Sequence, residues 1–583
     1  MQPKDKTLAT DPTIATQVKI LPAGTRPATV TPLLWLPLLV ISATAFAAEI
    51  PFFFFGTPSG HDVEFHLYSW LEVLSQWKQG IVYPRWAAMA HFGYGEPRFV
   101  FYPPASWALG AALSALFPWT FAVDIYIWMV LVAAGVSMFA LLRQWLPRRD
   151  AIFAAAFYAV NPYHLVIIYW RSAFAELLAS CVLPLLLLFL LKAASGSRRA
   201  IVPLALLLAG AWLINAPAAV MIHYSFALLI VVLAWQRRSP RLLLVGAAAV
   251  ALGACLAAFY LMPAIYEQRW VNIAEAVSTG YRPQDNFIFI HTADAEHDTF
   301  NHLISWLALA EIGVLLLAAW AARSLRKSNR ELWNALAVWA TACMVLLFPV
   351  SALFWRFAPK LRFMQFPWRW LLCLSMILSV VIAFGLRRWP ARALVCAGAI
   401  LLIVFSGYRI QRPWWEDADD LQELRDNMVQ PNTTQPNAGA GGYEGTDEYT
   451  PTGADSSAID KSARRVVVDG PEHAGIRVVQ WNAESKEFTA EMAAPARLAL
   501  HLFNYPAWKV EVNGRAVQAG ARESTGQMLV PVEAGANRVQ ITFARTWDRR
   551  VGGWISLVTA LLVVLWIVAA KVRRRSAEFA AAF

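Results

Sequence analysis

Charged residues are scarce in this chain of 583 residues, where Asp, Glu, Lys and Arg together make up 15%. A typical soluble domain has about 25%. Hydrophobic residues make up 58%, and long apolar runs recur along the chain. This composition excludes a soluble multidomain protein and indicates an integral membrane protein that crosses the bilayer many times.

Cysteines and local catalytic motifs are also scarce. The five cysteines all fall inside apolar runs, without the spacing of a zinc knuckle or of a disulfide framework, and we interpret them as small core residues. They are Cys181, Cys255, Cys343, Cys373 and Cys396. The sequence has no P-loop, no HExxH helix and no GxSxG context, so nothing indicates an ATP-driven machine or a membrane hydrolase.

The apolar runs predict about twelve membrane spans, each close to the ~20 residues that cross the hydrocarbon core. They lie near 33–55, 121–142, 151–169, 173–191, 201–214, 217–235, 242–262, 302–322, 332–352, 368–386, 391–408 and 551–570. The stretch 105–117 is left out because about 13 residues are more typical of a re-entrant or interfacial segment. Residues 1–32 are polar and predict a disordered cytoplasmic tail.

The net charge of +11 does not indicate nucleic-acid binding, because the basic residues gather in short clusters between apolar runs. If 105–117 does not cross, every strong cluster falls on the side of the N-terminus. The positive-inside rule then places both termini, including the tail 571–583, in the cytoplasm. The segments 56–120, 263–301, 353–367 and 409–550 become external.

The last external segment predicts a domain of its own. Residues 409–463 are acidic and rich in Gly, Pro, Asn and Thr, which predicts an irregular linker. From 464 to 547 the sequence alternates with a period of two, and Asn513-Gly514 is a hairpin signal. We therefore expect a small antiparallel β-sandwich, followed by one last span.

The external loop after the first span carries the first candidate catalytic pair. If this segment is helical, Asp62 and His66 lie one turn apart on the same face, whereas Glu64 points to the other face. Asp62 could act as a general base helped by the imidazole, or the two side chains could share a divalent cation. They could equally be solvated loop residues, and no metal motif is strong enough to assign a cofactor.

Other candidates lie at the external ends of spans. Arg85, Tyr94, Glu96 and Tyr102 stand in turns rich in Pro, Gly and aromatic residues, which suit sugar stacking or an interfacial aromatic belt. Tyr163, Arg171 and Glu176 flank the next corner, where a carboxylate that enters the membrane requires a partner. A structural ion pair with Arg171 is the alternative reading.

The segment 356–369 is cationic on the predicted external side. Arg362, Gln365 and Arg369 could bind an anionic ligand such as a lipid phosphate, with arginine giving bidentate contact. The headgroups of the outer leaflet are the alternative. Glu311 and His223 lie within spans and could line a polar route or form hydrogen bonds between helices.

These residues together resemble a known group of membrane proteins. The matching motifs are Gly60-His61-Asp62 with His66, Gly93-Tyr94-Gly95 with Pro97, Phe101-Tyr102 with Pro104, Arg171 with Glu176, and Gln365-Phe366-Pro367-Trp368-Arg369. They resemble the bacterial membrane proteins called 6-pyruvoyl-tetrahydropterin synthase-related, within the GT-C superfamily of membrane glycosyltransferases. The tail, with Phe503–Trp508 and Glu448–Pro451, is similar to the YfhO-like family, although Ala507 replaces the glycine of that family's Pro-Gly-Trp motif.

The resemblance covers about 33–570 and implies a GT-C-like transmembrane domain over 33–408 in a bacterial inner membrane. It implies transfer of a sugar from a polyprenyl-phosphate donor to a glycan, lipid or protein acceptor at the external face. Asp62 would then be the base, and Arg362 or Arg369 would hold the donor phosphate. The rival functions are a lipid-linked glycan transporter or flippase and a non-catalytic membrane scaffold.

Overall fold

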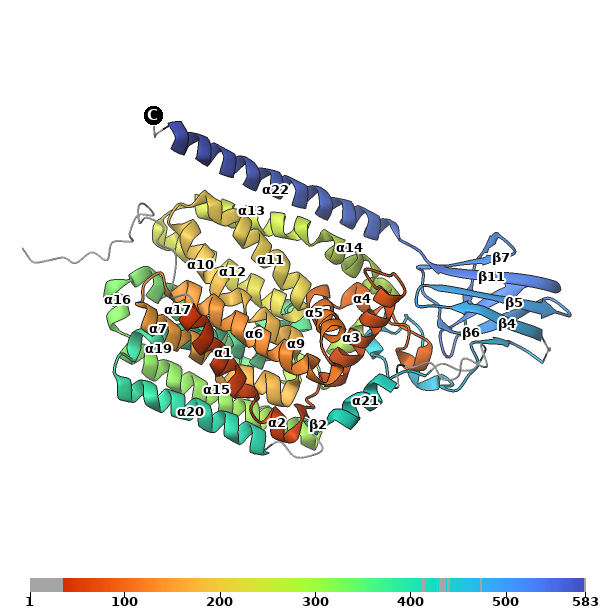
Figure 1. The fold of residues 1–583 in the computed structure, drawn as a ribbon, viewed down its shortest axis with the longest axis horizontal. Coiled ribbons are helices and arrows are strands. Elements are labelled where there is room, and N and C mark those ends of the chain that lie inside the picture. The colour runs from red at the N-terminus through yellow and green to blue at the C-terminus, as the bar shows by residue number, and fades with distance from the viewer. Residues whose placement is uncertain are drawn as a thin grey trace, which may run out of the picture.

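The computed structural model describes residues 35–580, apart from 410–414, 427, 429–436, 438–440 and 472–473. The predicted tail 1–32 lies outside these residues. Figure 1 shows a helical body with a β region at one end, and the last helix returns along the outside of the body. The predicted mostly helical protein with a C-terminal β-rich part is confirmed.

Within the described residues, nine helical segments are long and apolar enough to span a membrane, or up to eleven if two bent pairs each count as one span. The nine are Trp35–Phe55, Trp119–Leu142, Arg148–Arg171, Phe174–Ala194, Ala216–Arg237, Ala295–Ala321, Pro367–Gly385, Trp389–Tyr408 and Trp547–Val572. The pairs are Arg241–Leu256 with Ala258–Trp270, bent by 77°, and Arg330–Leu346 with Pro349–Phe357, bent by 94°. The difference from twelve is the run 201–214, which forms a helix of only 14 residues, α11 (Ile201–Ile214).

The helices that build the body follow the apolar runs of the sequence. They are α1 (Trp35–Glu49), α6 (Trp119–Leu142), α7 (Arg148–Ala159), α9 (Phe174–Ala179), α10 (Val182–Ala194), α11, α12 (Ala216–Arg237), α13 (Arg241–Leu256), α14 (Ala258–Glu267), α15 (Ala295–Ala321), α17 (Arg330–Leu346), α19 (Leu371–Gly385), α20 (Trp389–Arg409) and α22 (Trp547–Ala580). The chain turns between α11 and α12, where Asn215 Oδ1 accepts a hydrogen bond from the Ala218 amide at 2.8 Å.

Helix α19 lies in the middle of the body and contacts α7, α15 and α17, and nearly all of its side chains are buried. Helix α22 packs mainly on α13 and α14 and leaves most of its apolar residues exposed. An exposed apolar surface of this length on a helix suits contact with lipid.

The β region contains two antiparallel sheets. One has the order β3-β6-β10-β9 and the other β4-β5-β11-β7-β8. The strands are β3 (Val466–Val468), β4 (Ala474–Trp481), β5 (Ser485–Met492), β6 (Ala496–Phe503), β7 (Trp508–Val512), β8 (Arg515–Val517), β9 (Gly520–Ala521), β10 (Gln527–Val532) and β11 (Gly535–Phe543). Side chains from both sheets, such as Phe488 and Leu500, belong to one hydrophobic cluster.

The predicted hairpin at Asn513-Gly514 joins β7 and β8. Val512 pairs with Arg515, so the loop has two residues, and both have positive φ, 52° and 76°. Asn and Gly tolerate these angles better than other residues, which is why the pair marks this turn.

A buried ion pair connects the β region to the helical body. Both carboxylate oxygens of Glu267, at the end of α14, accept hydrogen bonds from Arg549 of α22 at 2.6 Å. The Tyr505 hydroxyl, from the loop after β6, donates to the same carboxylate at 2.6 Å. Two helices and the β region therefore meet at one carboxylate.

The segment expected to be an irregular linker has more order than its composition indicates. It contains the helix α21 (Ala418–Asp426) and the short strand β2 (Trp415–Glu416), which pairs with β1 (Thr57–Pro58) of the first loop. The ring of Tyr443 stacks on Tyr68 at 4.1 Å. Long-range contacts of this kind give no periodic signal in the sequence.

The short apolar run forms α5 (Pro104–Leu116), which packs on α3 (Val63–Lys78). A Cβ on Gly110 would lie 2.0 Å from the buried ring of Trp70.

We predict that Gly110→Ala destabilises the protein by about 1–3 kcal/mol through overpacking. Gly210→Ala in α11 is the matched control, because a Cβ there meets nothing within 4 Å. The melting temperatures in detergent check this, and equal values for the two variants would contradict it.

Candidate functional site

The loop that carries Asp62 is attached to the corner between two spans. The Gly60 amide donates to Ser172 Oγ at 2.9 Å, and the Asp62 amide donates to the Arg171 carbonyl at 2.9 Å. A Cβ on Gly60 would lie 2.5 Å from the Arg171 backbone. The close approach therefore requires glycine and places Asp62, the residue before α3, beside Arg171.

Four charged side chains and one phenol meet at this corner, and we call them the Asp62 cluster: Asp62, Tyr163, Arg171, Glu176 and Arg369. Arg171 Nη2 lies 3.8 Å from Asp62 Oδ2, and Arg171 Nη1 donates to Glu176 Oε2 at 2.6 Å. Arg369 Nε lies 3.2 Å from the same Glu176 oxygen, and the Tyr163 hydroxyl donates to the other at 2.7 Å. The structure therefore brings together five of the predicted site residues, from three separate parts of the chain.

Burial divides this cluster into a closed and an open part. The side chains of Arg171, Glu176 and Arg369 are 3%, 2% and 9% exposed, whereas that of Asp62 is 43% exposed. The two carboxylates and two guanidinium groups balance in charge, which charges in a buried site require. Asp62 is the acidic member that a ligand can reach.

Aromatic rings surround the two guanidinium groups. Arg171 lies over Trp368 at 4.7 Å, and Arg369 lies over Phe366 at 4.7 Å. The Phe366 and Trp368 rings are stacked on each other, and Trp368 contacts Phe300 of α15. These contacts fix the planes of both guanidinium groups.

His66 lies one helical turn after Asp62, as expected, but its side chain is directed into the protein. It is 2% exposed, and its Nδ1 lies 3.3 Å from the Tyr102 hydroxyl. Burial lowers the pKa of His66 to about 4, so the imidazole is neutral near pH 7. Within the described residues no hydrogen bond joins the His66 imidazole to the Asp62 carboxylate, although the Asp62 charge acts on the imidazole. The pairing of base with imidazole and the shared cation stay predictions.

The remaining predicted residues of the cationic segment lie apart from the closed part of the cluster. Arg362 is exposed, together with Arg356 and Lys360. The Gln365 side chain donates to the Ala276 carbonyl at 2.8 Å. Arg362 therefore faces outward, whereas Arg369 is enclosed.

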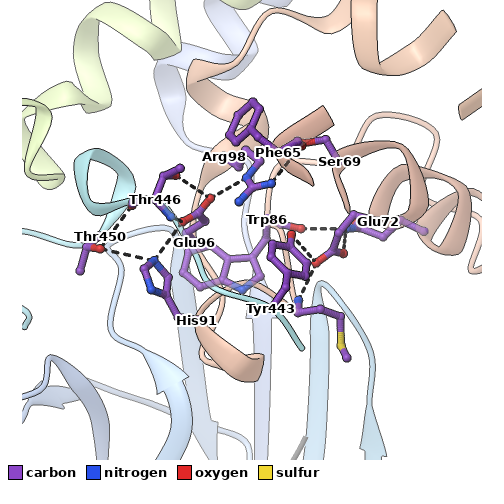
Figure 2. Close-up of polar contacts among 12 residues, drawn as sticks. Phe65, Ser69, Glu72, Trp86, His91, Glu96, Arg98, Tyr443, Thr446 and Thr450 are labelled. Atoms are coloured by element: carbon purple, nitrogen blue, oxygen red, sulfur yellow. Dashed lines mark hydrogen bonds and ion pairs between the residues drawn. The ribbon is translucent and has the colours of Figure 1, made fainter. Parts of the chain in front are cut away.

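Glu96 belongs to a second, closed network, which Figure 2 shows. Its carboxylate accepts from Arg98 at 2.6 Å and from the Thr446 amide at 2.9 Å, and it lies 2.9 Å from His91 Nε2. Glu96 and Arg98 are 0% and 1% exposed. Thr446 and the stacked Tyr443 belong to the segment before the β region, so this network fastens that segment to the first loop. Its enclosure leaves Glu96 no surface for a substrate.

Tyr94 and Arg85 also make contacts within the protein. The Tyr94 ring stacks on His501 of β6 at 3.8 Å, and its hydroxyl donates to the Asp460 carbonyl at 3.0 Å. Arg85 lies over the Tyr83 ring at 4.1 Å. These two residues lie where the first loop meets the β region and the helical body.

Two titratable residues with shifted pKa values, Glu448 and Tyr281, were not among the predicted site residues. Burial, together with the charges of Glu96 and Asp447, raises the pKa of Glu448 to about 7. Burial, then the charges of Glu448 and Asp62, raise the pKa of Tyr281. Tyr281 therefore lies within electrostatic reach of both carboxylates. In the sequence, Glu448 stood out only as part of the Glu448–Pro451 motif that resembles the YfhO-like family. That resemblance did not assign Glu448 to the site.

Glu176 neutralises two guanidinium groups, so its removal leaves both of them buried and unpaired. We predict that Glu176→Gln destabilises the protein by about 3–5 kcal/mol. Asp62→Asn is the matched control, because that carboxylate is 43% exposed and its loss costs little. Thermal unfolding in detergent checks this, and a melting temperature of Glu176→Gln equal to that of the wild type would contradict the structural role.

The buried ion pair of Glu96 should make the stability of the protein depend on pH. Burial raises the pKa of Glu96, but the Arg98 charge and the hydrogen bonds outweigh this effect and lower it to about 2 from 4.5. The stabilisation by the carboxylate is therefore complete above pH 4.5 and is lost as the pH falls towards 2. Glu96→Gln should melt well below the wild type at pH 7, and the difference should shrink across this window. A difference independent of pH would contradict the ion pair.

The family profile described as "6-pyruvoyl-tetrahydropterin synthase related domain; membrane protein" matches residues 99–411. No curated protein matches the chain. The match includes Tyr102, the corner with Arg171 and Glu176, and the segment with Arg369, but begins after Asp62. Since this profile covers more than half of the sequence, the chain belongs to the 6-pyruvoyl-tetrahydropterin synthase-related family of membrane proteins.

Proposed function

We propose that the protein is a GT-C-type glycosyltransferase that uses a sugar on polyprenyl phosphate. The observation that carries the proposal is the Asp62 carboxylate, partly exposed beside the buried guanidinium groups of Arg171 and Arg369. A base next to fixed positive charge is the arrangement that transfer from a phosphate leaving group requires.

In the proposed reaction, the Asp62 carboxylate takes the proton from an acceptor hydroxyl as its oxygen attacks the anomeric carbon. The bond from that carbon to the phosphate oxygen breaks, and polyprenyl phosphate leaves with the electron pair. Configuration at the anomeric carbon is inverted. The arginine charges stabilise the negative charge that develops on the phosphate.

Arg171 and Arg369 have separate tasks in this proposal. Arg171 lies 3.8 Å from Asp62 and orients it. Arg369 supplies charge from inside the protein, while the exposed Arg362, with Arg356 and Lys360, meets the phosphate where it enters from the lipid. The long tail of the donor explains why the site stands at the end of membrane spans.

The topology belongs to the same proposal. In this proposal the short helix α11 also crosses and makes twelve spans. The positive-inside rule then places both termini in the cytoplasm and the first loop, with the β-sandwich formed by the two sheets, on the outside of a bacterial inner membrane. Attachment of the β region through Glu267 and Arg549 holds it close to the membrane surface. There it can cover the site or hold the acceptor glycan, lipid or protein.

A transport function requires a polar route through the body. Glu311, the strongest candidate for such a route, is 3% exposed and accepts a hydrogen bond from Ser375 of the neighbouring α19 at 2.7 Å. This contact is a link between helices, so the geometry supports transfer better than transport.

Asp62→Asn tests the proposal. We expect this variant to express and fold normally but to lose transfer by about 10²-fold or more, because the acceptor hydroxyl is no longer deprotonated. The measurement is the release of polyprenyl monophosphate from polyprenyl-phosphate hexoses and pentoses in proteoliposomes. Glu64→Gln, two residues away and exposed, is the matched control and should retain activity.

Equal release by the wild type and Asp62→Asn would contradict the role of Asp62. Loss of function in Glu311→Gln with Asp62→Asn unaffected would instead favour transport.

A further inference from the structure

We propose a zinc site formed by His291, Asp298 and His302, at the start of α15. None of these three residues belongs to the Asp62 cluster, and the inference is independent of the proposed function. His291 lies in the segment before the helix, Asp298 in its first turn, and His302 one turn later.

Three ligand atoms form a nearly regular triangle. His291 Nδ1 lies 3.4 Å from Asp298 Oδ2 and 3.3 Å from His302 Nε2, and His302 Nε2 lies 3.6 Å from Asp298 Oδ2. Zinc bonds of about 2.0–2.1 Å in a tetrahedron place neighbouring ligand atoms about 3.3–3.4 Å apart. The corresponding separation in an octahedral magnesium site is about 2.9 Å. The triangle therefore has the size of one face of a zinc tetrahedron.

The carboxylate is held in a suitable orientation. Asp298 Oδ1 accepts a hydrogen bond from the Thr292 amide at 2.9 Å and lies 3.4 Å from His291 Nδ1. Oδ2 lies at the same distance from His291 Nδ1 and 3.6 Å from His302 Nε2, so it is the oxygen near both imidazoles. Such a contact to the oxygen that does not bind the metal orients a ligand carboxylate. Two imidazoles and one carboxylate suit zinc better than calcium or magnesium, which prefer oxygen alone.

The site is open on one side. The side chains of His291, His302 and Asp298 are 74%, 40% and 25% exposed. Zinc ions with three protein ligands keep a fourth position for water or another ligand. We therefore infer an open site in which solvent completes the tetrahedron.

Zinc at this position would cross-link the segment before α15 to the first two turns of the helix. The same turns carry Phe300, which contacts Trp368 and the His61 ring beside Asp62. Occupancy would thus restrict the helix end that borders the Asp62 cluster.

The experiment uses the full-length protein in detergent, purified without a polyhistidine tag and stripped with a chelator. After equilibrium dialysis against micromolar Zn²⁺, elemental analysis should find about one zinc per chain in the wild type. His291→Ala and His302→Ala should each weaken binding by about tenfold or more. His297→Ala is the matched control and should bind as the wild type does, because its Nε2 contacts Asn286 at 2.9 Å and not this cluster.

A second readout is independent of stoichiometry. Zn²⁺ should raise the melting temperature of the wild type and of His297→Ala but not of His302→Ala. The proposal is overturned if the wild type holds no zinc, if His302→Ala binds as tightly as the wild type, or if Mg²⁺ or Ca²⁺ occupies the site in preference.

Discussion

The pairing of one buried carboxylate with two guanidinium groups determines the architecture of the candidate site. Glu176 enters a membrane span, where an unpaired charge is costly, and Arg171 and Arg369 compensate it within 2.6 and 3.2 Å. These partners lie on the same corner and on a segment almost 200 residues later in the sequence. The three side chains therefore fix how two distant parts of the membrane domain meet.

The open position of Asp62 follows from this pairing. Arg171 is held by Glu176 through its side chain and by the Asp62 amide through its backbone, so Asp62 has a fixed neighbour while its carboxylate remains exposed. A second network around Glu96 closes the far part of the same loop against the segment before the β region. One loop thus carries an enclosed network that stabilises it and an accessible carboxylate that can do chemistry.

The sequence predicted the elements better than their contacts. The apolar runs predicted the spans, and Asn513-Gly514 predicted the hairpin, because periodicity and turn preferences are local properties of the sequence. The free-energy cost of burying an unpaired charge also predicted the pairing of Arg171 with Glu176. His66 and Glu96 show the limit of such local signals. A spacing of one turn places the His66 side chain on a helix but does not say which face of the helix is buried. The contact of Glu96 with Thr446 spans 350 positions and leaves no pattern in the sequence.

The most direct test of the account is an experimental structure of the protein with polyprenyl monophosphate in a lipid nanodisc. We expect the phosphate to lie at the exposed side of the Asp62 cluster, within hydrogen-bond reach of an arginine of the 362–369 segment. The lipid tail should then run along the neighbouring spans. A phosphate bound elsewhere, with Asp62 facing empty solvent far from it, would contradict the central claim.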